Sequence, residues 1–410
     1  MINVTLAPKR LSAYSKFVNK KVLSDIKTSA KALKGKRIVE INSTAEGGGV
    51  AEMLKSYIPL MQDCGLNVSW RVIMPDSQFF KVTKNIHNCL QGTCELPEKA
   101  QLDYYHDYLQ RQARHVPDAD LYILHDPQTL GLIDHLPPGK PIIWRCHIDL
   151  TNANPTTLGW VKEYYKKLHK IIFSLDNYAL GVDKSKVALI PPAIDPLSDK
   201  NKPLSSKEAD DLLEDFNIDT EKPFVTQISR FDKFKDPLGV LEMYAKLKRD
   251  TPELGCVLMG GYATDDPEGY PYFQQVRRKI AELKLGDIRV ITKEDGLLVN
   301  ALQSQAAVVI QNSSREGFGL TVTEALWKGA YVFARPVGGI ALQVINRKTG
   351  FYILDDELDR DRISDVIKNP DKYKAIKKAA TKHVKDHFLV TRLLLDHLNL
   401  YRQATASVEK

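Results

Sequence analysis

Apolar runs of strand length alternate with helix-length segments along almost the whole chain. The runs occupy residues 36–42, 68–73, 121–125, 141–145 and 170–174 in the first half, and residues 224–229, 255–259, 288–291, 307–310 and 331–334 in the second. Strands that alternate with helices form parallel sheets. A chain of 410 residues is long enough for two or three domains, each with its own core. The pattern therefore predicts an α/β protein with more than one parallel sheet.

Residues 190–198, Ile-Pro-Pro-Ala-Ile-Asp-Pro-Leu-Ser, separate the two groups of strands. Three prolines remove backbone donors and fix the backbone, so this segment cannot be a regular helix. We interpret it as the connection between two domains, residues 1–192 and residues 193–385.

The overall composition excludes several classes of protein. Hydrophobic residues make up 43% of the chain and charged residues 27%, as in soluble globular proteins. The net charge of +7 is spread without long runs, and no nucleic-acid-binding module is recognisable. Residues 1–10 lack the apolar core of a secretory signal, and no apolar run reaches membrane-spanning length. We expect a cytoplasmic protein that binds neither nucleic acid nor membrane.

Two further features bear on the surroundings of the chain. Five cysteines, an odd number without a C-x-x-C pair, predict reduced and mostly buried thiols. Residues 16–34 carry small apolar residues at helical spacing with lysines between them. A helix packed on the first domain is favoured over a membrane-surface helix, because its apolar residues are small and few.

The most informative stretch is residues 312–329, Asn-Ser-Ser-Arg-Glu-Gly-Phe-Gly-Leu-Thr-Val-Thr-Glu-Ala-Leu-Trp-Lys-Gly. It follows an apolar run and reads as a polar turn carrying Glu316, Gly317 and Gly319, then a helix that begins near Leu320. In an open α/β sheet such a turn lies where ligands bind, and the helix start attracts an anion. The glycines would let the backbone approach that anion closely. The alternative is a capped surface helix after a buried strand.

The spacing of Glu316 and Glu324 disfavours a glycoside hydrolase. On one α-helix, eight residues would separate them by about 12 Å along the axis, whereas a hydrolase pair needs about 5 to 9.5 Å. The two carboxylates are better suited to holding two ends of an extended ligand.

A second basic element follows the strand at residues 224–229. Arg230 and Lys235 stand five positions apart at the end of that strand. Arginine offers a planar fork for phosphate oxygens and lysine a mobile point charge, so together they can neutralise a diphosphate. Solvated surface charge is the alternative.

The first domain has its own glycine loop. Residues 43–49, Ser-Thr-Ala-Glu-Gly-Gly-Gly, follow the first strand and precede a helix that we expect to begin near Val50. The loop lacks the lysine and hydroxyl of a P-loop and does not match G-x-G-x-x-G. A bare glycine turn remains the alternative to a binding loop.

The run E-G-F-G-L-T-x-T-E-A-L resembles the E-x7-E signature of retaining nucleotide-sugar glycosyltransferases. These enzymes have two Rossmann-like domains that face each other across a cleft, the GT-B fold. The resemblance implies that Glu316 contacts the donor sugar, that Glu324 contacts the nucleotide ribose, and that Arg230 and Lys235 form the family's R-x4-K pair. It also implies that a last helix, residues 386–410, crosses back to the first domain.

Further stretches narrow the resemblance to the trehalose glycosyltransferring synthases. They are residues 42–52, 83–92, 125–128, 144–149 and 263–269. The implied reaction joins glucose from UDP-, ADP- or GDP-glucose to free glucose and gives α,α-trehalose reversibly, with retention at the donor anomeric carbon.

The same resemblance implies the residues of the site. The expected catalytic residues are His147, Arg230, Lys235 and Glu316. The expected donor-binding residues are Gly48, Gly49, Ser229, Arg230, Lys235, Ile291, Glu316, Gly317, Phe318, Gly319, Leu320, Thr321 and Glu324. The expected acceptor-binding residues are Glu46, Asp126 and His147.

Two of these assignments carry their own alternatives. We expect the imidazole of His147 to donate a hydrogen bond to a sugar hydroxyl, although a histidine after a buried strand is often structural. Asp126 would bind or orient the acceptor, or would merely cap a helix.

The sequence offers no convincing carboxylate nucleophile, which favours front-face transfer with a phosphate oxygen taking the acceptor proton. No metal site and no obligatory cofactor are expected, although Mg²⁺ could accompany the nucleotide. A homodimer is kept open.

Three alternatives to the synthase reaction also remain open. They are a trehalose phosphorylase of the same fold, a related glycosyltransferase with fructose or a sugar phosphate as acceptor, and a non-catalytic sensor of nucleotide sugars.

Overall fold

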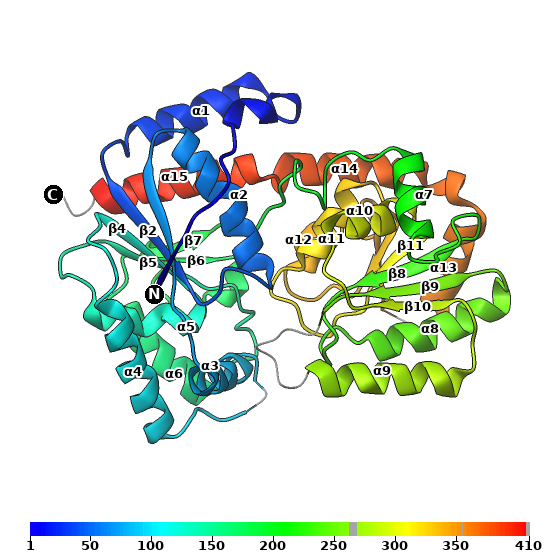
Figure 1. Ribbon diagram of the computed structural model, residues 1–410, viewed down its shortest axis with the longest axis horizontal. Helices are drawn as coiled ribbons and strands as arrows, with labels where there is room; N and C mark the ends of the chain where they lie inside the picture. The colour runs from blue at the N-terminus through cyan, green and yellow to red at the C-terminus, as the bar shows by residue number, and fades with distance from the viewer. Residues whose placement is uncertain (93, 262–268, 355, 407–410) are drawn as a thin grey trace. The chain divides into compact units, whose positions relative to one another are not determined.

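The computed structural model describes residues 1–92, 94–261, 269–354 and 356–406. The chain divides into two compact units (Figure 1). Unit 1 comprises Met1–Ala193 and Val390–Lys410, and unit 2 comprises Ile194–Leu389. Each unit contains a sheet of mainly parallel strands between layers of helices, so the predicted α/β fold with two parallel sheets is confirmed.

The sheet of unit 1 has the strand order β1-β3-β2-β4-β5-β6-β7. In chain order the strands are β1 (Ile2–Val4), β2 (Arg37–Asn42), β3 (Asn67–Val72), β4 (Leu121–His125), β5 (Ile142–Arg145), β6 (Lys170–Phe173) and β7 (Val187–Leu189). Strand β1 is antiparallel to β3, and the other neighbours are parallel. The edge strands β1 and β7 were not predicted, because each is only three residues long and its side chains are exposed or half-buried.

Helices cover both faces of this sheet (Figure 1). One group contains α1 (Lys20–Lys31), α2 (Gly49–Asp63) and α15 (Val390–Ala406), and the other contains α3 (Ser77–Leu90), α4 (Lys99–Ala113), α5 (Asp126–Leu130) and α6 (Pro155–Tyr165). Helix α1 buries Ile26 and Ala30 against unit 1, and its Ser29 hydroxyl donates to Asn399 of α15 at 2.9 Å. The prediction of a helix packed on the first domain is confirmed.

The sheet of unit 2 is entirely parallel, with the order β10-β9-β8-β11-β12-β13. Its strands are β8 (Phe224–Ile228), β9 (Gly255–Met259), β10 (Ile288–Ile291), β11 (Val308–Gln311), β12 (Val332–Ala334) and β13 (Phe351–Tyr352). Its helices are α7 (Ser206–Glu214), α8 (Pro237–Asp250), α9 (Gly269–Leu283), α10 (Gly296–Gln305), α11 (Leu320–Trp327), α12 (Ile340–Gln343), α13 (Asp356–Lys368) and α14 (Lys374–His387). Short 3-10 turns occur at Leu11–Lys16, Gly131–His135, Asp176–Tyr178, Lys184–Lys186 and Pro370–Tyr373.

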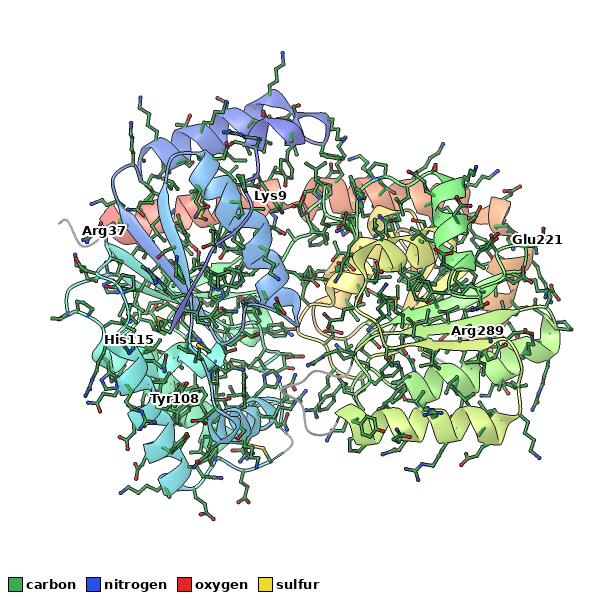
Figure 2. The ribbon with its side chains drawn as sticks, in the orientation of Figure 1. Lys9, Arg37, Tyr108, His115, Glu221 and Arg289 are labelled. Atoms are coloured by element: carbon green, nitrogen blue, oxygen red, sulfur yellow. A yellow bond between two sulfur atoms is a disulfide. The ribbon has the colours of Figure 1, made fainter. Side chains whose placement is uncertain are left out.

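The strand order reverses once in each sheet. In unit 1 the reversal lies between β2 and β4, and in unit 2 it lies between β8 and β11. Ligands of open α/β sheets bind beside the carboxyl ends of the two strands at such a reversal. Opposite this edge in unit 1, at the amino end of β2, Arg37 pairs with Asp118 at 2.7 Å and with Asp120 at 3.5 Å (Figure 2).

One prediction about the cysteines is wrong. Cys89 and Cys94 form a disulfide, whereas Cys64, Cys146 and Cys256 are free thiols. Helix α3 ends at Leu90, and Gly92 at φ +80° turns the chain back, which brings the two Cα atoms to 4.7 Å. The prediction rested on the absence of a C-x-x-C pair, but this turn joins cysteines five positions apart.

Candidate active site

The site of unit 2 is built on the loop that follows β8. Ser229 donates its backbone N–H to Met259 of β9 at 2.9 Å, and Gly260 packs directly against the Ser229 backbone. A methyl group at Gly260 would lie 1.8 Å from the Ser229 carbonyl oxygen, so only glycine fits. Arg230 then emerges with a half-exposed side chain, 3.6 Å from Asp232.

Lys235 and Glu316 join the loops after β8 and β11. The Lys235 ammonium lies 2.5 Å from Glu316 Oε2, and the two side chains are only 15% and 11% exposed. Gln227 donates to the Lys235 carbonyl at 2.7 Å, and the Ser313 hydroxyl donates to Glu316 Oε2 at 3.3 Å. A desolvated cation is thus held at the strand reversal of unit 2.

The start of α11 completes this edge. Gly319 adopts φ +82° immediately before α11, which begins at Leu320 as predicted. Glu324 in this helix is buried. The buried Gln343 donates to the Phe318 carbonyl at 2.5 Å, which fixes the turn that precedes the helix. The first amides of α11 therefore stand close in sequence to Glu316, at the same strand end.

Asn312 ties three of these loops together. Its amide donates to Asp236 after β8 at 2.7 Å, and its carbonyl oxygen accepts from Arg335 after β12 at 2.8 Å. The turn after Arg335 packs closely on Phe318. A methyl group added at Gly339 would lie only 2.5 Å from the Phe318 Cα atom. The loops after β8, β11 and β12 form one rigid edge.

Ile291 and Thr321 lie at this edge as well. Ile291 ends β10 with a buried side chain, and its carbonyl accepts from Gly260 at 2.9 Å. Thr321 is partly exposed in the first turn of α11. The stretch at 263–269 that entered the family resemblance lies outside the described residues up to position 268.

In unit 1 the glycine loop leads from β2 into α2. Gly47 at φ +74° and Gly48 at φ +157° bend the chain, and α2 begins at Gly49. Glu46, Gly48 and Gly49 are all exposed. The loop presents backbone amides at a helix start without a capping side chain.

His147 follows β5 and is tied to the end of β4. Its Nε2 lies 3.1 Å from Nδ1 of His125, with the two rings stacked. Its backbone N–H donates to Asp126 Oδ1 at 2.7 Å. Asp126 therefore orients the His147 loop, and the alternative that its side chain caps a helix is wrong.

Burial alters the protonation of this group. It lowers the pKa of His147 well below its ordinary value, and the positive charge of Arg145 lowers it further. Burial also raises the pKa of Asp126 to about 6, against the hydrogen bond from His147. His147 is consequently neutral at physiological pH.

Sequence reasoning missed a buried polar network beneath His147. His125 Nε2 lies 2.8 Å from Glu40 Oε2, and the Tyr401 hydroxyl of α15 donates to Glu40 Oε1 at 2.6 Å. Arg145 lies 3.1 Å from His397 and donates to the Ile190 carbonyl at 2.8 Å. Glu40 stands in the middle of an apolar strand, and a carboxylate there is rarely buried without a partner. The position of Glu40 in that strand was the one sequence signal that could have revealed the network.

The predicted site residues fall into two groups. Unit 1 holds Glu46, Gly48, Gly49, Asp126 and His147, and unit 2 holds Ser229, Arg230, Lys235, Ile291, Glu316, Gly317, Phe318, Gly319, Leu320, Thr321 and Glu324. Within the parts of the chain that the structure describes, no cluster of three or more His, Cys, Asp or Glu side chains could bind a metal ion. Over the same residues, no helix has the length and apolar character to span a membrane.

Comparison with known proteins agrees with the division of the chain into two units, because a different family model matches each unit. Residues 40–180 match the family described as trehalose synthase, N-terminal domain, and residues 208–383 match glycosyl transferases group 1. The chain is 40% identical over 401 residues to the trehalose synthase of Thermococcus litoralis, covering 96% of each protein. It is 28% identical to the trehalose phosphorylase of Grifola frondosa, covering 92% of this chain and 58% of that protein.

Among solved structures, the α,α-trehalose-phosphate synthase (UDP-forming) of Burkholderia vietnamiensis has the same fold. Its TM-score is 0.74 at 13% identity, covering 91% of this chain and 99% of that one. The fold is therefore GT-B, as predicted. With 40% identity along nearly its whole length and with the family's two characteristic domains, the chain belongs to the trehalose synthase family and is a hexosyltransferase.

Proposed function

We propose that the chain is a retaining glucosyltransferase that forms α,α-trehalose from a nucleoside-diphosphate glucose and free glucose, and that it catalyses the reverse reaction as well. The observation that carries the proposal is the Lys235–Glu316 pair at the strand reversal of unit 2, 2.5 Å apart and close to the start of α11. The 40% identity to a trehalose synthase supports the same reaction.

Unit 2 binds the diphosphate of the donor in this proposal. Arg230 presents a guanidinium fork and Lys235 an ammonium, and the first amides of α11 add a partial positive charge. An ammonium has three N–H donors, so Lys235 can hold Glu316 and a phosphate oxygen at once. Together these groups stabilise the negative charge that grows on the leaving diphosphate.

The remaining contacts to the nucleotide-sugar donor lie along the same edge of the unit 2 sheet. Glu316 binds hydroxyls of the glucosyl group, and Glu324 binds the ribose. Ser229, Ile291 and the turn before α11 border the nucleotide. Uridine is the first base to assay, because the Burkholderia synthase of the same fold is UDP-forming.

Unit 1 supplies the acceptor side. Asp126 and His147 are linked through the His147 backbone N–H, so they form one rigid pair of polar groups for the acceptor glucose, and the His147 ring also orients the glucosyl group. Glu46, Gly48 and Gly49 belong to the exposed glycine loop after β2. We assign Glu46 to the acceptor and assign Gly48 and Gly49 to the donor phosphates. The neutral ring of His147 matches the neutral hydroxyls of a sugar, and the carboxyl groups of Glu46 and Asp126 can accept hydrogen bonds from such hydroxyls.

The chemistry proceeds on one face of the glucosyl ring. The bond from the anomeric carbon to the diphosphate oxygen breaks, and a bond to the acceptor oxygen forms on the same side. The acceptor proton passes to the departing phosphate oxygen. No protein nucleophile or obligatory metal takes part, and Mg²⁺ can accompany the nucleotide.

A trehalose phosphorylase is the strongest alternative within the fold. The chain spans 96% of the Thermococcus synthase but only 58% of the Grifola phosphorylase, which favours the synthase reaction. A pure sensor of nucleotide sugars would not need every one of these charged and polar groups, whereas the chain has all of them: His147, Arg230, Lys235, Glu316 and Glu324.

The test is incubation of the purified protein with glucose and, in turn, UDP-, ADP- and GDP-glucose, with products identified by NMR. The proposal expects α,α-trehalose and the matching nucleoside diphosphate. Fructose and sugar phosphates replace glucose in parallel reactions to test the acceptor. Glucose 1-phosphate from trehalose and inorganic phosphate, without nucleotide-dependent synthesis, would make the protein a phosphorylase. If no reaction shows turnover, the protein would be the non-catalytic sensor of nucleotide sugars.

A further inference from the structure

A chain of hydrogen bonds connects a buried cation to a buried anion beneath His147. Arg145 and Glu40 are both fully buried, and they are linked through His397 and Tyr401 of α15. Glu40 continues to His125, and His125 continues to His147. None of these partners of His147 takes part in the reaction described above.

The donors and acceptors in this chain have a defined direction. A guanidinium only donates, so His397 Nε2 accepts from Arg145, and the His397 proton resides on Nδ1, 3.4 Å from the Tyr401 oxygen. The Tyr401 hydroxyl donates to Glu40 Oε1 at 2.6 Å. The other Glu40 oxygen then accepts the Nε2 proton of His125 at 2.8 Å.

Charge balance determines whether the remaining nitrogen of His125, Nδ1, carries a proton. Its side chain is fully buried, and the charge of Glu40 is already offset by that of Arg145 in the same network. The carboxyl group of Asp126 also faces this region, but its Oδ1 is engaged by the His147 backbone N–H at 2.7 Å. A protonated His125 would put a second buried cation beside the His147 ring, which is unfavourable.

We propose that Glu40 and His125 are positioning residues that hold His147 as its Nε2–H tautomer, so that the Nδ1 lone pair accepts a hydrogen bond from a hydroxyl of the glucosyl group. The inference rests on the proposed function, which brings the sugar to His147. It reverses the expectation from sequence that His147 donates this hydrogen bond.

The direction of the hydrogen bond between His147 and the sugar hydroxyl matters for glucosyl transfer. Positive charge develops at the anomeric carbon and ring oxygen in transition states of this type. A cationic imidazolium beside the sugar would oppose that charge, whereas a neutral ring that accepts from a sugar hydroxyl leaves more electron density on the sugar. The relay of Glu40, His125 and His147 therefore keeps positive charge away from the glucosyl group on which positive charge develops.

The first test measures the tautomer without any turnover. The full-length protein, labelled with ¹⁵N at its ten histidines, is studied by long-range ¹H–¹⁵N NMR near neutral pH. A His147→Asn variant identifies the His147 signals. The proposal expects a protonated Nε2 and an unprotonated Nδ1. An Nδ1–H tautomer or an imidazolium at His147 would overturn it. Failure to form trehalose would remove the proposed function and leave this result intact.

The second test separates positioning from structural support. Glu40→Gln keeps the size of the side chain but lets an amide donate to His125, which frees the tautomers of His125 and His147. We expect kcat to fall at least about tenfold, as when a catalytic histidine loses its orienting carboxylate, with a much smaller change in donor KM.

Tyr401→Phe is the matched control, because it removes a hydrogen bond from the same carboxylate without touching His125. It should lower thermal stability, keep the His147 tautomer and hold kcat within about threefold of the parent. Equal losses of kcat in both variants, with the parent tautomer retained in both, would show a structural network and overturn the proposal.

Discussion

The ligand-side edges of the two sheets share a topology but differ in charge. In unit 1, the strand reversal carries the buried neutral ring of His147 on a network of buried partners. In unit 2, the equivalent reversal carries Arg230 and the Lys235–Glu316 ion pair in partly exposed loops. In the function we propose, the loops specialise the same scaffold toward uncharged hydroxyls in one unit and toward an anion in the other.

The difference follows from burial. Helix α15 covers Glu40 and Arg145, so each charge there needs a partner inside the protein. The half-exposed Arg230 can be hydrated until a ligand arrives. Four changes to the protein or its solvent would break or sharpen this comparison.

The largest expected effect concerns the cation of unit 2. Lys235→Ala should lower kcat about 10- to 150-fold, because a hydrogen bond to a charged group contributes about 1.5–3 kcal/mol. Lys233→Ala, two residues earlier in an exposed position, is the control and should stay within about twofold. Steady-state kinetics with the nucleotide-glucose measures both. Equal rates in the two variants would remove Lys235 from the mechanism.

A glycine beside Arg230 tests the shape of the same edge. Gly260→Ala places a methyl group 1.8 Å from the Ser229 carbonyl oxygen and must displace the Ser229–Arg230 backbone. We expect the donor KM to rise about 5- to 150-fold, since such overpacking costs about 1–3 kcal/mol. Gly286→Ala, with open space around its Cα atom, should leave the donor KM unchanged. The donor KM of both variants is measured by varying the concentration of the nucleotide-glucose. An unchanged donor KM in Gly260→Ala would contradict this account of the edge.

The buried carboxylate of unit 1 gives a pH-dependent prediction. Because burial raises the pKa of Asp126 to about 6, the folded state binds its proton more tightly than the unfolded chain, and the cost of ionisation grows as pH rises. Asp126→Asn removes that cost. Its stability relative to the parent should be greater near pH 7.5 than near pH 5, by on the order of 1 kcal/mol in denaturant unfolding.

Asp183→Asn is the control of opposite sign. Hydrogen bonds from Ser185 hold the pKa of Asp183 below its ordinary value, so the charged form is the favourable one in the folded state. This variant should lose stability relative to the parent as pH rises. A gain for Asp183→Asn, or a pH-independent effect of Asp126→Asn, would contradict the assignment.

The smallest effect comes from salt. Raising NaCl from about 50 to about 500 mM should raise the KM for the nucleotide-glucose about two- to fivefold while leaving the KM for glucose nearly constant, because salt screens charge and not neutral hydrogen bonds. Kinetics with one substrate varied at a time gives both constants. A parallel rise in both would mean that the two edges do not differ in the way described.

Long apolar runs allowed much of the fold to be predicted from sequence. The runs at 121–125 and 255–259 coincide with β4 and β9, because buried parallel strands are mostly apolar along their length, and the run at 288–291 coincides with the edge strand β10 although Arg289 in it is exposed. The start of α11 at Leu320 was also predicted, because Gly319 marks it. The edge strand β13, with two residues, has too short a pattern to be recognised.

The partners of the site residues could not be predicted. Lys235 and Glu316 are 81 positions apart and meet only because β8 and β11 are neighbours in the sheet. The donor or acceptor state of His147 depends on His125 and, through it, on Glu40, which comes from another strand of the sheet. Residue type indicated that His147 could bind a sugar, but tertiary packing decides which of its nitrogens carries the proton.

The most direct test of the ionic edge in unit 2 is a crystal structure of the protein with its preferred nucleoside diphosphate. We expect the diphosphate oxygens within hydrogen-bond distance of Arg230, of Lys235 and of a backbone amide in the first turn of α11. A diphosphate bound elsewhere, with Lys235 contacting Glu316 and no phosphate, would contradict the account.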